Sequence, residues 1–306
     1  MSDQHPNSYY AEKFRVGTGK EVLLKEWLTD DKDKPVNKDE GVNILKTDIQ
    51  KLSEIQEKLY ASNRYSVLIV IQAMDAAGKD SVIKHVMSGL NPQGVTVTPF
   101  KTPTHLELEH DYLWRHYIAL PARGMVGIFN RSHYENVLVT KVHPEYILNE
   151  NLPGIQTVAD IDKAFWEKRF KQINHFEKTL ADNGTVILKF FLHVSKKEQK
   201  KRFLERINDP GKNWKFSPTD IKERGLWKEY RKAYEQLLQN TSNDLAPWFI
   251  IPADDKWFTR YVFANIIVNE LTRLDLSYPG LTDQQKKDLE DAKKSLTGEA
   301  NGDISD

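Results

Sequence analysis

The stretch from Ala73 to Ser81 (AMDAAGKDS) carries the residue types best suited to binding phosphate. It follows an almost continuous apolar run, Ser66 to Gln72, and precedes a segment with helical periodicity. In that context, backbone N–H groups at the start of a helix hold phosphate oxygens while Lys79 neutralises their charge. The match to the P-loop pattern GxxxxGK[ST] is incomplete, because Ala73 replaces the first glycine and Asp80 replaces the metal-binding Ser or Thr. An ordinary strand-to-helix turn with a solvated lysine therefore stays an alternative.

Asp75 favours the phosphate-binding interpretation. A carboxylate inside an anion-binding loop repels phosphate unless a cation lies between the two groups. The sequence therefore predicts bound Mg²⁺ at this loop, with Mn²⁺ as the alternative ion.

A second cluster follows the apolar run at 125–129, where Asn130 to Glu135 (NRSHYE) bring polar groups to the end of a predicted strand. In open α/β sheets, ligands bind at the carboxyl ends of the strands. Arg131 has the planar fork that holds a phosphate with two hydrogen bonds, although a salt bridge to the sheet would also explain it. A lone His133 beside aromatic residues is better explained as a packed residue than as a base.

Positive charge is concentrated between residues 196 and 232, where thirteen Lys and Arg stand against six Asp and Glu. A solvated helix face is the ordinary explanation of such a run. Here the run brackets a break rich in Gly and Pro at 208–218, which predicts a mobile lid that brings cations over a phosphate. Arg202 and Arg206 share one helical face just before the break, and Arg206 is predicted to reach the site.

The elements that would position these residues alternate along the chain. Apolar runs at 66–72, 95–100, 125–129, 185–194 and 248–251 are typical of buried strands. Helical patterns precede and separate them, at 42–61, 79–90, 105–119, 131–140, 159–182, 195–207, 219–239 and 256–274. This order predicts a three-layer α/β/α fold around a parallel five-stranded sheet. We expect an N-terminal helical arm (1–62), a core (63–275) with a lid at about 208–224, and a polar, partly disordered tail (276–306) with a short helix near 283–296.

The composition excludes several classes of protein. The 306 residues include 44 Lys and Arg, 44 Asp and Glu, and no Cys, so there is no thiolate nucleophile, disulfide or Cys-ligated metal. The sequence has no apolar stretch of membrane-spanning length and starts without a signal-peptide profile, so a cytoplasmic protein without a membrane anchor is expected. The zero net charge argues against a general nucleic-acid binder, although charge is segregated: residues 281–306 hold seven acidic against four basic residues.

Four groups of residues together resemble the polyphosphate kinase 2 family, over about residues 40–275. They are Met74 to Lys79; Phe129 to Tyr134; Ile173 to Glu177 with Ile187 to Ser195; and Glu198 to Phe203 with Asp209 to Lys215. The resemblance implies a thymidylate-kinase-like P-loop NTPase fold with a helical lid. It also implies Mg²⁺-dependent, reversible transfer of the terminal phosphate of inorganic polyphosphate to a nucleotide, in a homo-oligomer.

The resemblance assigns roles to individual residues. It implies Asp75, Lys79, Arg131 and Glu135 as catalytic residues, and Asp75, Asn130 and Glu135 as metal ligands. The implied polyphosphate-binding residues are Ala76, Ala77, Gly78, Lys79, Asp80, Arg131, Arg202, Arg206, Lys212 and Lys215. The implied nucleotide-binding residues are Asp75, Lys101, Thr102, Thr104, Asn130 and Glu135, although Thr104 is equally well explained as the N-cap of a helix.

Two positions depart from the commonest family pattern. Many members have Asp at the position of Asn130, and many have Asn at the position of Glu135. The pair in this chain is similar to the class III subgroup, which implies transfer to both mono- and diphosphates: AMP to ADP to ATP, and also GMP and GDP. Two alternative functions stay open: an ATP-dependent nucleotide kinase of the same fold, and a catalytically silent polyanion-binding module.

Overall fold

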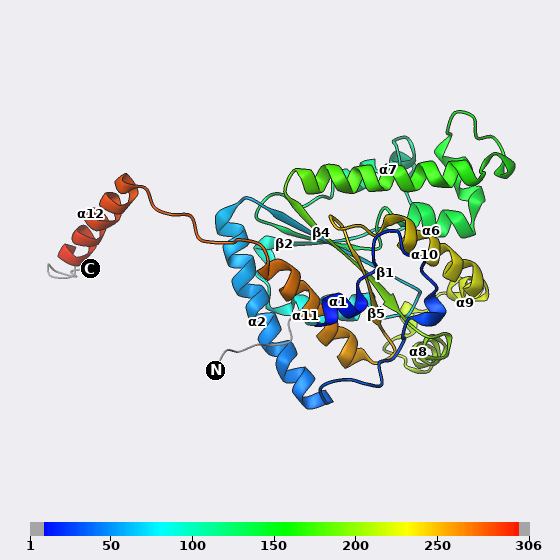
Figure 1. Cartoon of the computed structure of the whole chain (residues 1–306), viewed down its shortest axis with the longest axis horizontal. Helices are drawn as coiled ribbons and strands as arrows, with labels where there is room; N and C mark the ends of the chain where they lie inside the picture. The colour runs from blue at the N-terminus through cyan, green and yellow to red at the C-terminus, as the bar shows by residue number, and fades with distance from the viewer. Residues whose placement is uncertain (1–8, 300–306) are drawn as a thin grey trace.

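A five-stranded parallel sheet forms the centre of the computed structural model, which describes residues 9–299 (Figure 1). The strands are β1 (Ser66–Ala73), β2 (Val95–Pro99), β3 (Val126–Asn130), β4 (Thr185–His193) and β5 (Trp248–Pro252), in the order β2-β3-β1-β4-β5. The predicted α/β fold and parallel sheet are confirmed. Because β1 lies beside β3 with parallel pairing, the loops that follow these two strands meet at one edge of the sheet.

Helices cover both faces of the sheet (Figure 1). On one face α11 (Lys256–Thr272) packs against α1 (Tyr9–Phe14), α2 (Lys38–Ser62) and α3 (Lys79–Val86). On the other face, α6 (Glu135–Val142), α7 (Lys163–Asp182) and α10 (Trp227–Thr241) pack together. Since both faces are covered, β1 and β4 can be apolar along most of their length, as a strand in a doubly covered sheet must be.

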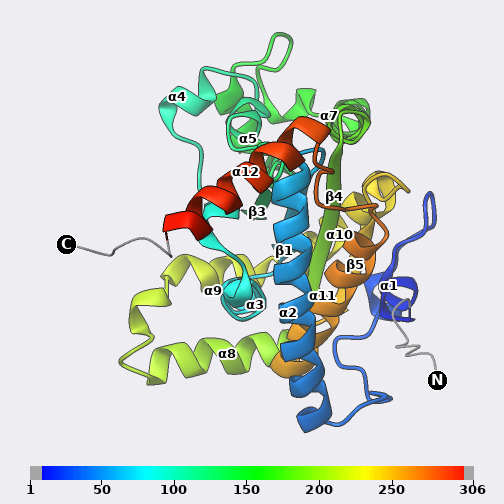
Figure 2. The same cartoon turned by 90° about the vertical axis from the view of Figure 1, so that its left-hand side faces the viewer.

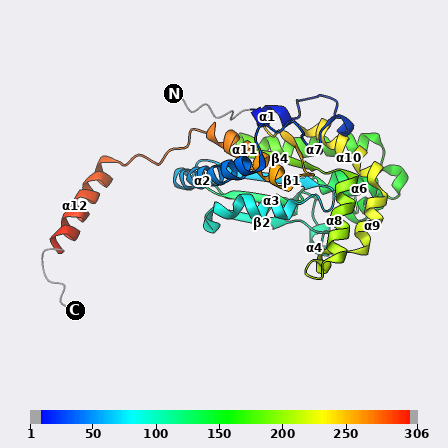
Figure 3. The ribbon, with the colours of Figure 1, turned by 90° about the horizontal axis from the view of Figure 1, so that it is seen from below.

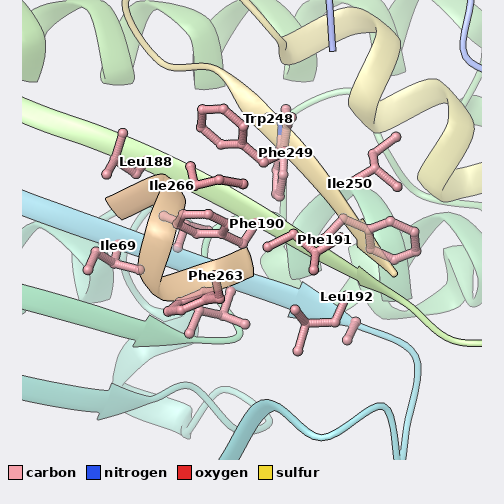
Figure 4. Packing of buried hydrophobic residues seen from close by; sticks show 14 of the residues in the cluster. Ile69, Leu188, Phe190, Phe191, Leu192, Trp248, Phe249, Ile250, Phe263 and Ile266 are labelled. Atoms are coloured by element: carbon pink, nitrogen blue, oxygen red, sulfur yellow. The ribbon is translucent and has the colours of Figure 1, made fainter. Parts of the chain in front are cut away.

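Aromatic side chains fill the space between the sheet and α11 (Figure 4). The ring of Phe190 on β4 lies 4.3 Å from that of Phe263 on α11 and 5.5 Å from that of Phe249 on β5, measured between centroids. All three residues are fully buried. Burial of an aromatic side chain of this size stabilises the fold by roughly 2–3 kcal/mol, so this cluster anchors α11 on the sheet.

Three predicted helices differ most from the structure. The one predicted at 219–239 is two helices, α9 (Pro218–Gly225) and α10, with Leu226 between them. The single helix predicted at 105–119 is broken into α4 (His105–Leu108) and α5 (Trp114–Tyr117), because the carboxylate of Asp111 accepts a hydrogen bond from the N–H of Leu113 and forms a local turn. The helix predicted to start at residue 131 starts only at 135, since Arg131 has a left-handed backbone with φ of 64°.

The two ends of the described chain differ in how they meet the sheet. Tyr10 and Phe14 of α1 are buried, and the N–H of Val16 donates to the carbonyl of Trp248 on β5 (2.9 Å). By contrast, α12 (Asp283–Glu299) lies apart from the sheet and its helices (Figures 1 and 3). The helix expected near 283–296 is present as α12 and extends to residue 299, and the last seven residues of the predicted tail, 300–306, lie outside the described part. Within 9–299 no helix is both long and apolar enough to span a bilayer.

A polar network is buried under the end of β3. The ammonium of Lys189 donates to Glu177 Oε2 (2.6 Å), Tyr134 Oη (2.8 Å) and the carbonyl of Thr241 (2.7 Å). Glu177 Oε1 accepts from Tyr134 Oη (2.7 Å) and lies 3.1 Å from His133 Nε2. Burial alone would raise the pKa of Glu177, but Lys189 and His133 outweigh it and lower that pKa. Lys189 therefore has a partner for each of its three donors, and His133 is a packed residue as expected.

Removing one member of the buried ion pair between Lys189 and Glu177 should destabilise the folded protein. We expect Lys189→Met to lower the free energy of unfolding by about 3–5 kcal/mol, because it leaves the Glu177 carboxylate buried without its cation. In the double variant Lys189→Met with Glu177→Gln, much of that loss should be recovered, since no buried charge remains. Urea unfolding of the three proteins measures this, and equal stability of wild type and Lys189→Met would contradict it.

Candidate active site

The loop after β1 has the form of an anion-binding site. Ala76 is left-handed (φ 60°), and Gly78 (φ 108°) precedes the first turn of α3. Small residues are needed here because two positions with positive φ lie within three residues. Lys79 opens α3 and its ammonium donates to the carbonyl of Ala73 (3.1 Å). Burial lowers the pKa of Lys79 and nearby Arg131 adds to this effect, against the opposing influence of Asp75, Glu135 and Asp80.

The loop after β3 meets this loop at the same edge of the sheet. Arg131 Nη2 lies 3.3 Å from Asp75 Oδ1, and Asn130 Nδ2 donates to Asp80 Oδ1 (2.8 Å). Burial alone would lower the pKa of Arg131, but the carboxylates of Glu135 and Asp75 outweigh it and raise that pKa. Burial raises the pKa of Glu135, against the opposing effects of Arg131 and Lys79. The structure thus brings together all four residues that were expected to be catalytic.

A cavity of about 660 Å³ opens on these loops. Cationic side chains outnumber carboxylates along its walls: it is lined by Lys79, Lys101, Arg131, Arg202, Arg206, Lys212, Lys215, Lys256 and Arg260, against Asp75, Asp80, Glu205 and Asp220. We call this the cationic cavity. Among the aromatic residues, only Phe100 and Trp214 border it, and Trp214 is 78% exposed. Such a wall suits a chain of phosphates better than a nucleobase.

A second cavity, of about 300 Å³, lies on the other side of Asp75 and Arg131. Its wall includes four aromatic residues, Tyr146, Trp227, Tyr230 and Tyr234, as well as Thr102 and Glu135. We call this the aromatic cavity. Asp75, Arg131 and Asp220 line both cavities, so the two spaces meet at these side chains. An aromatic wall beside an arginine suits a nucleotide, whose base stacks and whose phosphates are anionic.

The arrangement agrees with the comparisons with known proteins. A model of the family described as "Polyphosphate kinase 2 (PPK2)" matches residues 35–277. The chain belongs to the polyphosphate kinase 2 family. It is 47% identical over 285 residues to an "ADP-polyphosphate phosphotransferase" of Rhodopseudomonas palustris, an alignment that covers 93% of this chain and 98% of the relative. It is 42% identical over 269 residues to an "AMP/ADP-polyphosphate phosphotransferase" of Meiothermus ruber, covering 88% and 95%.

Solved structures of the polyphosphate kinase 2 family share the fold. The crystal structure of polyphosphate kinase 2 from Arthrobacter aurescens TC1 superposes with a TM-score of 0.83 at 37% identity, covering 94% of this chain and 96% of that one. The expected P-loop fold is therefore confirmed across nearly the whole chain.

The segment predicted as a lid, at about 208–224, consists of short helices beside the cationic cavity. It follows α8 (Lys196–Asn208) and contains a 3₁₀ turn (Asn213–Lys215) and most of α9 (Pro218–Gly225) (Figure 2). Within the basic run 196–232, Arg206, Lys212 and Lys215 line the cationic cavity, whereas Lys197, Lys200 and Lys201 lie on a separate shallow surface. The basic run is thus partly a solvated helix face, the alternative that the sequence left open.

The nucleotide residues expected from the polyphosphate kinase 2 resemblance are divided between sites. Thr102 and Glu135 line the aromatic cavity, but Lys101 lines the cationic one. Thr104 lines neither and instead caps α4, where its hydroxyl accepts the N–H of Glu107 (3.3 Å). The four aromatic residues of the aromatic cavity were not predicted. Three of them, Trp227, Tyr230 and Tyr234, lie at helical spacing and resemble core positions, and Tyr146 lies outside every predicted element.

Arg202 has a different environment from the one expected for a phosphate ligand. It is 5% exposed, and its guanidinium donates to the carbonyls of Ala76 (3.1 Å), Ala77 (2.7 Å), Ala253 (2.6 Å) and Asp254 (3.1 Å), with Nε bonded to Glu198. Every nitrogen of the fork therefore has a protein acceptor. These contacts give Arg202 a structural role in holding the phosphate loop, and they do not support direct polyphosphate binding.

Exchange of arginine for lysine separates these two roles. Arg202→Lys keeps the charge but cannot reach four carbonyls at once, so we expect the free energy of unfolding to fall by about 2–4 kcal/mol. Arg206→Lys is the matched control on the same helix. It should change stability by less than about 0.5 kcal/mol, because a lysine can keep both the 3.7 Å ion pair with Asp220 and the contact with the Phe203 ring. Thermal and urea unfolding measure both, and equal effects of the two changes would contradict the structural role.

Proposed function

We propose that the protein is a polyphosphate-dependent nucleotide kinase that transfers the terminal phosphate of inorganic polyphosphate, reversibly, to nucleoside mono- and diphosphates. The observation that carries this proposal is the pair of cavities that meet at Asp75 and Arg131. The cationic cavity suits the phosphate donor, and the aromatic cavity suits the acceptor. The names of the Rhodopseudomonas and Meiothermus relatives, which specify ADP and AMP/ADP, support polyphosphate as the donor and adenine nucleotides as acceptors.

The residues of the site would act by position and charge. In the reaction, an oxygen of the acceptor's terminal phosphate bonds to the terminal phosphorus of polyphosphate, and the bond from that phosphorus to the next bridging oxygen breaks. The acceptor oxygen is already ionised, so no strong general base is required. Lys79 and Arg131 hold the transferred group between the cavities, and Arg206, Lys212 and Lys215 hold the rest of the polyanion while the lid excludes water.

Phosphotransferases of this family generally need a divalent cation, and we infer Mg²⁺, with Mn²⁺ as an alternative. Asp75 fits such an ion, because its side chain is 31% exposed and faces both cavities. Within residues 9–299 there is no cluster of three or more acidic or His side chains that could hold a metal. An ion at Asp75, with Asn130 and Glu135 nearby, would therefore take its remaining ligands from phosphate and water, as Mg²⁺ commonly does. It would neutralise charge on the phosphates.

We also infer that GMP and GDP are acceptors, that nucleic acid and membranes are not partners, and that the enzyme is a cytoplasmic homo-oligomer. These inferences rest on the family resemblance and the composition. The division into an arm (1–62), a core (63–275) and a tail (276–306) stays part of this proposal.

Identifying the phosphate donor distinguishes this proposal from an ATP-dependent nucleotide kinase and from a silent polyanion-binding module. The protein is incubated with Mg²⁺, AMP or ADP, and long-chain polyphosphate, and nucleotide products are followed by chromatography. We expect ADP and ATP to accumulate without added ATP. Transfer from ATP alone would identify an ATP-dependent nucleotide kinase, and absence of transfer from either donor would identify a silent polyanion-binding module.

Lys79→Ala and Asp75→Ala test the assigned site. Each should lower kcat for polyphosphate-dependent transfer by at least about 100-fold, because each removes a group that organises the transferred phosphate. Lys84→Ala is the matched control, since Lys84 is an exposed lysine on the same helix, and it should leave kcat within about 3-fold. Persistent transfer by both site variants would show that the reaction takes place elsewhere.

Glu135→Asn tests the choice of acceptor. Glu135 lies at the start of α6 on the wall of the aromatic cavity, near Arg131 and Lys79. Removing its charge changes the number of acceptor phosphates that the site balances, so we expect the ratio of AMP to ADP turnover to change by about 5-fold or more. An unchanged ratio would remove Glu135 from the specificity determinants.

A further inference from the structure

We propose that Gln199 and Arg224 are positioning residues that couple α9, on the wall of the aromatic cavity, to the loop that carries Asp75. The proposal rests on the proposed function in one respect, that the aromatic cavity receives the acceptor nucleotide. It adds a route by which an acceptor in that cavity acts on the backbone of the phosphate loop.

The amide of Gln199 bridges two elements. Gln199 lies on α8 and is 3% exposed. Its Nε2 donates to the backbone carbonyl of Asp75 (3.0 Å), and its Oε1 accepts a hydrogen bond from Arg224 Nη1 (2.5 Å). A carbonyl requires a donor and a guanidinium requires an acceptor, so only one orientation of the amide satisfies both neighbours.

The loop at Asp75 needs such support. The next residue, Ala76, has a left-handed backbone (φ 60°), a strained conformation for a non-glycine residue. Arg202 holds the carbonyls of Ala76 and Ala77, and Gln199 holds the carbonyl of Asp75 itself. Gln199 is thus the member of this group that links the loop to α9.

The Arg224 end of this link lies at the aromatic cavity, the proposed acceptor site. Thr219, Asp220, Glu223 and Arg224 of α9 line the aromatic cavity. Glu223 Oε2 accepts a hydrogen bond from Tyr230 Oη (2.6 Å), which belongs to the aromatic wall, and lies 2.9 Å from His143 Nε2. A ligand that fills the cavity therefore contacts α9 directly, and Arg224 transmits the position of α9 to Gln199.

Through Gln199 and Arg224, the position of the phosphate loop depends on whether an acceptor is bound. When the acceptor is absent, the Arg224–Gln199 hydrogen bond, and with it the amide orientation that supports the Asp75 carbonyl, depends on protein contacts alone. When the acceptor is bound, the loop is held in the position required for transfer. Binding of the correct acceptor thereby completes the site, which disfavours transfer of polyphosphate phosphate to water.

The coupling can be tested by measuring kcat and acceptor affinity separately, because loss of the link should lower kcat and leave acceptor affinity nearly unchanged. We expect Gln199→Leu and Arg224→Ala each to lower kcat about 10–100-fold, while the dissociation constant for ADP, measured by calorimetry without donor, changes less than about 3-fold. The double variant should be no slower than the slower single variant, because the link is already broken. Arg224→Lys should recover part of the loss.

Lys222→Ala is the matched control, since it removes a positive charge from the exposed side of α9 and should leave kcat and ADP affinity unchanged. Losses that multiply in the double variant would overturn the proposal, as would wild-type kcat in Gln199→Leu. Weaker ADP binding by Arg224→Ala without any effect on kcat would also overturn it, because Arg224 would then act only as a direct ligand.

Hydrogen–deuterium exchange separates failure of this proposal from failure of the proposed function, because it needs no transfer reaction. We expect ADP to slow amide exchange in a peptide covering residues 74–79 of the wild type but not of Gln199→Leu. Equal protection in both proteins would overturn the coupling even if polyphosphate is the donor. Protection confined to the wild type would support the coupling even if the donor proved to be ATP.

Discussion

The buried guanidinium of Arg202 is the contact on which the geometry of the site depends. It joins the loop after β1 to the residues after β5, through carbonyls of Ala77 and Ala253 among others. In a planar trans peptide the N–H points opposite to the carbonyl, so turning the Ala77 carbonyl towards Arg202 directs the N–H of Gly78 to the other side. An arginine can do this because its fork offers five donors in fixed directions, and burial strengthens each bond by excluding water. One side chain on α8, the helix before the predicted lid, therefore shapes the loop and ties α8 to the sheet.

The charges that line the site, and not the net charge of the chain, determine how the site binds a polyanion. The chain carries no net charge, yet cations exceed carboxylates along the cationic cavity. Exposed charges more than about 8 Å apart are screened at physiological salt, so a polyanion responds to the cavity and hardly to the chain total. Within the site, Arg131 is paired with Asp75 and Asn130 with Asp80, which keeps these side chains ordered. A phosphate chain and its cation would exchange these contacts for stronger, charge-assisted ones.

The sequence was sufficient to predict the parts of the site that depend on chain order. Strand and helix alternation places the ends of β1 and β3 at one edge, and this alone brings Lys79 near Arg131. It was not sufficient for contacts that depend on how helices pack. Trp227 and Tyr230 lie on α10 and Tyr146 lies before α7, and nothing in their spacing distinguishes a cavity wall from a core. Likewise, a count of basic residues gives no direction to any side chain. It could not separate Arg202, whose guanidinium is bound by four backbone carbonyls, from Arg206, which forms an ion pair with Asp220 at the cavity wall.

The polar network beneath β3 explains why the Arg131 turn can persist. A left-handed backbone at a non-glycine residue is maintained only where the surroundings fix it more firmly than the strain opposes it. Immediately after Arg131, the buried hydroxyl of Ser132 accepts from Gln72 Nε2 (3.1 Å) and from the N–H of Tyr134 (3.2 Å). Tyr134 is then held by Glu177 and Lys189 from two further elements. Apolar residues of similar volume could stabilise the core equally well, since a buried ion pair often contributes little net stability. They could not fix the direction of the turn, because hydrogen bonds are directional and hydrophobic contacts are not.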